Sequence, residues 1–104
     1  MSGITTHVLD TSTGRPAVGV AVRLRSGAAE LASGVTDGDG RWVALEPGAT
    51  PAAAYQLVFA TGDYFRGGSF HPRVTIEFAV TDPDEHHHVP LLLSPYGYTT
   101  YRGS

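Results

Sequence analysis

The sequence contains no cysteine, which excludes a disulfide framework and a cysteine-ligated metal site. It also contains no lysine, because all seven basic residues are arginines scattered along the chain. The formal net charge is only −3, and the arginines form no basic stripe. This pattern gives no indication of nucleic acid as a partner.

Long apolar segments are also missing. No apolar run approaches the roughly 20 residues that a membrane-spanning helix needs, so we expect no membrane as a partner. The N-terminus, MSGITTHVLD, lacks a charged region followed by an apolar run, and we therefore expect no signal peptide. The chain ends in Arg-Gly-Ser rather than the peroxisomal Ser-Lys-Leu. The expected location is the cytoplasm.

Charged side chains are scarce as well. They make up 16% of the 104 residues, against about 25% in a typical soluble domain. This length suits one domain spanning residues 1–104, with one modest core. A low charged fraction in a small protein suggests that part of its surface is covered, and self-association is the simplest explanation.

The chain does contain many short stretches in which apolar and polar residues alternate, the pattern of half-buried strands. In residues 4–10, Ile4, Thr6 and Val8 share one face, and Thr5, His7 and Leu9 share the other. One helical turn is expected within 61–68, capped by Asp63 and ended by two glycines. The other expected strands are residues 18–24, 31–36, 41–45, 54–60, 74–80 and the two arms of a hairpin within 86–104. Eight short, evenly spaced strands predict an all-β sandwich or small barrel.

The turn at residues 37–40, Asp-Gly-Asp-Gly, begins like a calcium-binding loop. A loop of that kind requires a glutamate at its twelfth position, where this chain has Gly48. We therefore interpret these residues as a tight turn between strands.

The closing hairpin can be given a register from the sequence. If Ser94 and Gly97 close its turn, Pro90 faces Tyr101 and His88 faces Gly103 by antiparallel pairing. Alternation then places His86, His88, Tyr101 and Gly103 on one face, and His87 on the opposite, solvent-facing side.

Histidines are the main candidates for chemistry, because an imidazole titrates at roughly pH 6.5. His86 and His88 point the same way from one strand, and with His7 they could form a zinc site with an open position for water. Each could equally be a structural residue bonded to a neighbour. Arg41 would be an ordinary surface arginine when alone, but beside two histidines it could bind an anion or a developing oxyanion.

Several motifs resemble those of the 5-hydroxyisourate hydrolases, the transthyretin-related enzymes of purine catabolism. They are HVLD at 7–10, TGRPA at 13–17, DGR at 39–41 and HVPLLLSPYGYTTYRGS at 88–104. The YRGS ending and His7 separate the hydrolases from transthyretin itself, which has a lysine at that histidine. The departures lie in the Ala/Pro-rich 46–53 segment and at His71, where the family usually has an aromatic residue.

The resemblance implies a transthyretin-like (prealbumin-like) sandwich of two four-stranded sheets with one short helix. It also implies a homotetramer, a dimer of dimers, whose active sites lie in a channel where dimers meet. We therefore expect the tail of one subunit to lie close to a neighbour.

Carried over residue by residue, the resemblance implies a site of His7, Arg41, His88, Tyr101, Arg102, Gly103 and Ser104. It implies hydrolysis of a ring amide in 5-hydroxyisourate to 2-oxo-4-hydroxy-4-carboxy-5-ureidoimidazoline, without metal or other cofactor. His7 or His88 would deprotonate the attacking water. Arg41, together with Arg102, would bind the anionic ring and stabilise the oxyanion, while Tyr101 would orient the substrate.

Three alternatives remain open at the level of sequence. A small-molecule carrier in the manner of transthyretin would bind aromatic ligands without turnover. A zinc hydrolase would use His7, His86 and His88. A non-catalytic β-sandwich module of a larger secreted protein is the third, although a start at Met1 without a signal peptide argues against it.

Overall fold

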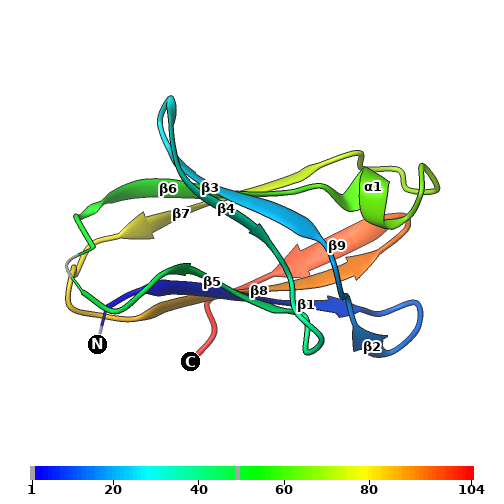
Figure 1. Cartoon of the computed structure of the whole chain (residues 1–104), viewed down its shortest axis with the longest axis horizontal. Helices are drawn as coiled ribbons and strands as arrows, with labels where there is room; N and C mark the ends of the chain where they lie inside the picture. The colour runs from blue at the N-terminus through cyan, green and yellow to red at the C-terminus, as the bar shows by residue number, and fades with distance from the viewer. Residues whose placement is uncertain (1, 49) are drawn as a thin grey trace.

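Two β-sheets lie face to face in a computed structural model that describes residues 2–48 and 50–104 (Figure 1). This architecture confirms the all-β sandwich. The strands are β1 (Ile4–Asp10), β2 (Arg15–Pro16), β3 (Ala21–Ser26), β4 (Ala29–Val35), β5 (Arg41–Leu45), β6 (Ala53–Phe59), β7 (Val74–Val80), β8 (His87–Ser94) and β9 (Gly97–Thr100), and one helical turn, α1, spans Thr61–Tyr64.

Strand β1 lies inside its sheet rather than at the edge. The order of that sheet is β2-β1-β8-β9, with β5 also paired to β1, and the order of the second sheet is β4-β3-β6-β7. The first sheet has five strands, one more than expected, because β5 and the short β2 pair with successive parts of the same edge of β1. The pairing of β1 with β8 is parallel, whereas all other strand pairs described are antiparallel.

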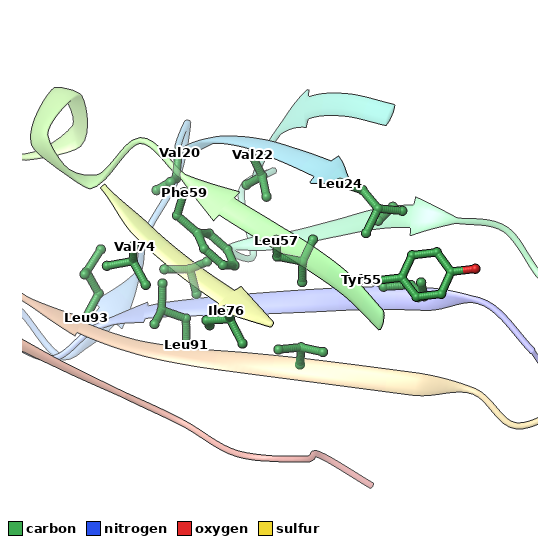
Figure 2. Packing of buried hydrophobic residues seen from close by; sticks show 14 of the residues in the cluster. Val20, Val22, Leu24, Tyr55, Leu57, Phe59, Val74, Ile76, Leu91 and Leu93 are labelled. Atoms are coloured by element: carbon green, nitrogen blue, oxygen red, sulfur yellow. The ribbon is translucent and has the colours of Figure 1, made fainter. Parts of the chain in front are cut away.

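The core consists of the side chains that the two sheets turn toward each other. The alternation predicted for β1 is confirmed, because Ile4, Thr6 and Val8 are buried while the residues between them are half-buried. Figure 2 shows the strands of both sheets contributing to one continuous apolar layer. Its largest fully buried side chains include Phe59, Leu24, Leu57, Leu91 and Leu93.

Two boundaries differ from the sequence prediction. Val18 was expected on the buried face of a strand, but it is 53% exposed and lies in a turn before β3. The left-handed backbone of Gly19, with φ of 78°, ends the regular alternation there. The short strand β2 also forms where only a turn was predicted.

The helical turn α1 forms where it was predicted, but its start differs. Ala60 occupies the N-cap position and makes no side-chain cap hydrogen bond, while Asp63 lies within the first turn. In that position the carboxylate can favour the N-terminal end of the turn electrostatically but cannot cap it. No helix among residues 2–48 and 50–104 is long and apolar enough to span a membrane.

The register of the closing hairpin is confirmed. Ser94 pairs with Gly97, and an isolated bridge joins His88 to Gly103, whose N–H donates to the carbonyl of His88 at 2.9 Å. β9 ends at Thr100, so the expected Pro90–Tyr101 pair is absent from the regular ladder. Proline has no N–H to offer a partner, and the hydroxyl of Thr100 donates to the Pro90 carbonyl at 2.8 Å instead.

His87 corrects the expectation that this side chain faces solvent. It does lie on the face opposite His86 and His88, but that face of β8 is turned inward and His87 is only 5% exposed. Its Nδ1 lies 3.0 Å from the carbonyl oxygen of Glu85, which satisfies one ring nitrogen. Alternation separates the two faces of a strand, but it does not identify the face that is covered.

A buried carboxylate links α1 to the end of β1. The hydroxyl of Tyr64 donates to Oδ2 of Asp10 at 2.9 Å, and the backbone N–H of Ser12 donates to Oδ1 at 2.9 Å. Burial acts to raise the pKa of Asp10, but hydrogen bonds from Ser12 and Tyr64 outweigh it, so the pKa is lowered. Burial and the neighbouring carboxylate raise the pKa of Tyr64 to about 12.

We expect Tyr64→Phe to lower the free energy of unfolding by about 1–3 kcal/mol, because it removes a donor from a buried charged acceptor. The lowered pKa of Asp10 stabilises the fold above the unfolded value of about 3.9, and this contribution is lost as pH falls through the folded value. The penalty should therefore shrink in acid. Urea unfolding at several pH values measures it, with the exposed Tyr96→Phe as control; equal effects of the two variants would contradict the role of this bond.

Candidate active site

The candidate site lies on the outer face of the first sheet, where β1 has a neighbour on each side. Thr5 is paired with Val43 of β5 and with His88 of β8, and His7 is paired with Arg41 of β5. Residues two apart on a strand share a face, so these side chains belong to one patch. The parallel register of β1 and β8 thus brings the motif at 7–10 next to the motif that begins at His88.

A hollow of about 290 Å³ opens on this patch. Its lining combines a cation, two imidazoles and the last residue of the chain with one aromatic and one aliphatic side chain. The lining residues are Thr5, Thr6, Arg41, Trp42, Val43, His86, His88 and Ser104. Figure 1 shows the C-terminal tail extending from this sheet on the side away from the second sheet.

His88 is the half-buried imidazole of the hollow. Burial lowers its pKa, and electrostatic interactions with His86, Arg41 and His7 lower it further. A lowered pKa keeps this ring neutral at pH 7 and leaves one nitrogen free to accept a proton. His88 therefore has the protonation state that a general base requires.

Arg41 owes its position to the turn that precedes β5. The carboxylate of Asp37 accepts hydrogen bonds from the N–H groups of Arg41 at 3.0 Å and Asp39 at 2.9 Å, which lowers the pKa of Asp37. Gly40 has φ of 76°, and a Cβ there would lie 2.4 Å from the carbonyl oxygen of Val8, so the turn requires glycine. The predicted tight turn between strands is confirmed.

The guanidinium of Arg41 is available for a ligand. The ion pairs found among residues 2–48 and 50–104 join Arg23 to Glu30 and Arg102 to Glu85, and neither involves Arg41. A cation in a concave site beside neutral imidazoles can bind an anion or stabilise an oxygen that gains negative charge.

The tail is divided between two places. Gly103 packs against the His88 ring, and Ser104 lines the hollow. Tyr101 and Arg102 instead line a second hollow of about 330 Å³ beside β7, and Arg102 lies 3.7 Å from Glu85. Tyr101 was expected to share a face with His88; the chain leaves the strand after Thr100, but both residues line this second hollow.

His7 lies beside the hollow but does not line it in this chain. It is half-buried on β1, directly opposite Arg41. The structure thus brings Arg41, His88 and Ser104 into one hollow, with Gly103 behind the His88 ring and His7 adjacent. The catalytic and binding roles expected for these residues stay predictions.

The zinc alternative lacks a third ligand. His86 and His88 have ring centroids 6.4 Å apart, and Thr5 lies between them. In the described part of the chain, no three histidine, cysteine or carboxylate side chains are grouped so that they could hold a metal ion.

Sequence reasoning missed Thr5 and Trp42 as lining residues. Thr5 was placed on the face of His7, but nothing indicated a role for it. The missing signal was the parallel pairing of β1 with β8, which sets Thr5 directly beside His88. Two strands more than 70 residues apart leave no local pattern that reveals their register.

These features define a class of protein: a transthyretin-like β-sandwich whose outer sheet face carries a hollow lined by histidine, arginine and the chain terminus. The family model described as "Transthyretin: HIUase/Transthyretin family" matches residues 4–103. The chain belongs to this family.

Relatives of known name are similar over their full length. The 5-hydroxyisourate hydrolase of Caulobacter vibrioides is 46% identical over 115 aligned positions, which cover 100% of both chains. The structure of Klebsiella pneumoniae 5-hydroxyisourate hydrolase has a TM-score of 0.90 at 42% identity and also covers 100% of both chains. Sea bream transthyretin, solved in complex with thyroxine, has a TM-score of 0.89 at 29% identity, covering 97% of this chain and 94% of that chain.

The contact between Gly103 and His88 can be tested by adding one methyl group. A Cβ on Gly103 would lie 2.5 Å from Cδ2 of His88, so the ring or the tail must move. We expect Gly103→Ala to expose the ring and to raise its pKa from the lowered value toward the ordinary 6.5.

Titration of the histidine side chains by NMR measures this shift. Gly97→Ala is the matched control, because a Cβ there would approach no atom closer than 3.9 Å. An unchanged pKa of His88 in Gly103→Ala would show that the tail does not hold the ring.

Proposed function

We propose that this chain is a 5-hydroxyisourate hydrolase that opens a ring amide of its substrate in urate catabolism, giving 2-oxo-4-hydroxy-4-carboxy-5-ureidoimidazoline. The observation that carries the proposal is the hollow in which His88, held neutral by burial and nearby cations, lies with Arg41. The full-length similarity to named 5-hydroxyisourate hydrolases supports the same reaction.

The chemistry begins with a water molecule in the hollow. A neutral imidazole, for which His88 is better placed than His7, accepts a proton from this water as its oxygen attacks the ring carbonyl carbon. The carbonyl oxygen becomes an oxyanion in the resulting tetrahedral intermediate. When the carbonyl re-forms, the C–N bond breaks and the ring nitrogen takes a proton from the imidazolium. The carboxylic acid that results releases its proton to water and remains as a carboxylate.

Arg41 stabilises the charge that develops during attack. Its guanidinium lines the same hollow as His88 and carries a permanent positive charge. Positioned acid–base help supplies about 10²–10⁴-fold in rate, and one oxyanion contact supplies about 10²–10³-fold. Ser104 lines the hollow from the tail side, and Gly103 packs against the His88 ring.

The remaining expected residues fit a site shared between subunits. Tyr101 and Arg102 do not line the hollow with Arg41 and instead line the second hollow beside β7, to which His88 also contributes. In the proposed homotetramer, a dimer of dimers, these side chains bind substrate at a neighbour's site together with His7. The outward residues of β1, Thr5, His7 and Leu9, are half-buried and Val43 beside them is exposed, so a second copy would cover a surface of mixed polar and apolar side chains.

A transthyretin-like carrier is the second candidate function, because the fold is as close to sea bream transthyretin as to the Klebsiella enzyme. The lower identity to transthyretin, 29% against 42%, weighs against it. A carrier would bind an aromatic ligand without consuming it, so the turnover assay below separates the two.

We expect the protein to accelerate the decay of 5-hydroxyisourate, generated from urate by urate oxidase and followed by absorbance. His88→Gln should lower kcat/KM by about 10²–10⁴-fold, because the base is lost. Arg41→Met should lower it by about 10²–10³-fold, because an oxyanion contact is lost. His71→Gln is the matched control, since His71 contacts Phe70 and Tyr98 away from the hollow. Decay no faster than the spontaneous rate would overturn the proposed function.

A further inference from the structure

The side chain of Thr5 contacts both His86 and His88, and it has no role in the reaction described above. Its Oγ1 lies 2.8 Å from Nδ1 of His88 and 2.9 Å from Nε2 of His86. A hydroxyl has one hydrogen, so it can donate to only one of the two rings. It must accept from the other ring if both hydrogen bonds are formed.

We propose that Thr5 is a positioning residue that couples the tautomers of His86 and His88, so that the two rings act as one proton-accepting unit. The consequence for rate rests on the proposed function. The hydrogen-bond coupling itself is a property of the three side chains and does not depend on the substrate.

Two arrangements of hydrogens allow Thr5, His86 and His88 to form both hydrogen bonds. In the first, Nδ1–H of His88 donates to Thr5, whose hydroxyl donates to Nε2 of His86. Nε2 of His88 then carries a lone pair and can accept a proton. In the second, Nε2–H of His86 donates to Thr5, whose hydroxyl donates to Nδ1 of His88, and Nε2 of His88 carries a hydrogen and can only donate. The direction of one hydroxyl therefore decides whether His88 is a base.

The surroundings favour the first arrangement. Arg41 lines the same hollow as His88, and a fixed positive charge stabilises a lone pair over an N–H group directed into that hollow. Other charged or titratable groups around the pair are His7 on β1, Glu46, which lines the adjoining hollow with His86, and Glu77 and Arg102, which line the second hollow with His88.

The same bridge can move charge out of the site. When Nε2 of His88 takes a proton from water, its Nδ1 proton can pass to Oγ1 of Thr5 while the hydroxyl proton passes to Nε2 of His86. At Thr5 one O–H bond breaks and another forms. His88 gains a proton at Nε2 and loses the one at Nδ1, while His86 gains one proton. The positive charge then lies on exposed His86 rather than on half-buried His88, where burial disfavours it.

Local geometry makes Thr5 suited to this role. Parallel pairing sets Thr5 directly beside His88, and His86 lies one step along the same face. The branched Cβ of threonine restricts its side-chain rotamers, so the hydroxyl stays between the rings. Valine has the same shape without the hydroxyl, and serine keeps the hydroxyl without the methyl group.

The first test reads the tautomers directly. Two-bond ¹H–¹⁵N correlation spectra of protein labelled with ¹⁵N-histidine identify which nitrogen of His88 carries the hydrogen above its pKa. We expect the Nδ1–H form in the wild type and in Thr5→Ser. We expect a shift toward the Nε2–H form in Thr5→Val, because Nδ1–H loses its acceptor. An identical tautomer of His88 in the wild type and in Thr5→Val would overturn the proposal.

The second test is kinetic, with 5-hydroxyisourate as substrate. Thr5→Val should lower kcat by roughly 10- to 100-fold with little change in KM, as for the loss of other groups that orient a functional histidine. Thr5→Ser should restore most of kcat. Thr75→Val, on β7 of the other sheet, is the matched control. Equal kcat values for the valine and serine variants would contradict the role of the hydroxyl.

The two tests separate this inference from the proposed function. If the wild type hydrolyses no 5-hydroxyisourate, the proposed function fails, whereas the spectra still decide whether Thr5 couples the rings. If the wild type is active but the His88 tautomer ignores Thr5, the proposed function stands and the coupling is wrong.

Discussion

The parallel pairing of β1 with β8 is the constraint on which the rest of the site depends. It joins residues near the two ends of the chain and sets Thr5 beside His88 and Thr6 beside Val89. The hydroxyl of Thr6 also donates to the carbonyl of Val89 at 2.6 Å, inside the core. Because side chains alternate along a strand, a slip of β8 by one residue would turn His86 and His88 to the opposite face. The same register therefore sets both the packing of the core and the chemistry of the surface.

Backbone contacts hold the charged and titratable side chains of the hollow in place in a small sandwich that has no long loops. Arg41 is held by the turn that begins at Asp37, and the tail is held by the bridge from Gly103 to His88. Both contacts are made to backbone groups of Arg41 and His88, so they leave the guanidinium and Nε2 of the imidazole for a ligand. Burial and neighbouring cations keep His88 neutral, a state that favours proton acceptance at neutral pH.

Local pattern predicts local geometry well in this chain and long-range geometry poorly. The turn closed by Ser94 and Gly97 determined the hairpin register, including the meeting of His88 with Gly103, because turn length fixes antiparallel pairing. Alternation placed His7 and Thr5 on one face. It could not reveal that the face of His87 is buried, nor that Tyr101 leaves the strand, because both depend on where distant segments pack. The motif resemblance gave the family, and it also supplied the predicted site residues, which periodicity could not.

The pH dependence of kcat/KM with 5-hydroxyisourate tests most directly whether neutral His88 is the base. The pKa of His88 is lowered, so this ring is neutral above that pKa and protonated below it. We expect kcat/KM to be constant near neutral pH and to fall in acid with a midpoint below 6.5, matching the pKa of His88 measured by NMR in the free protein. A kcat/KM that stays constant through the pKa of His88 would contradict the assignment of this residue as the base.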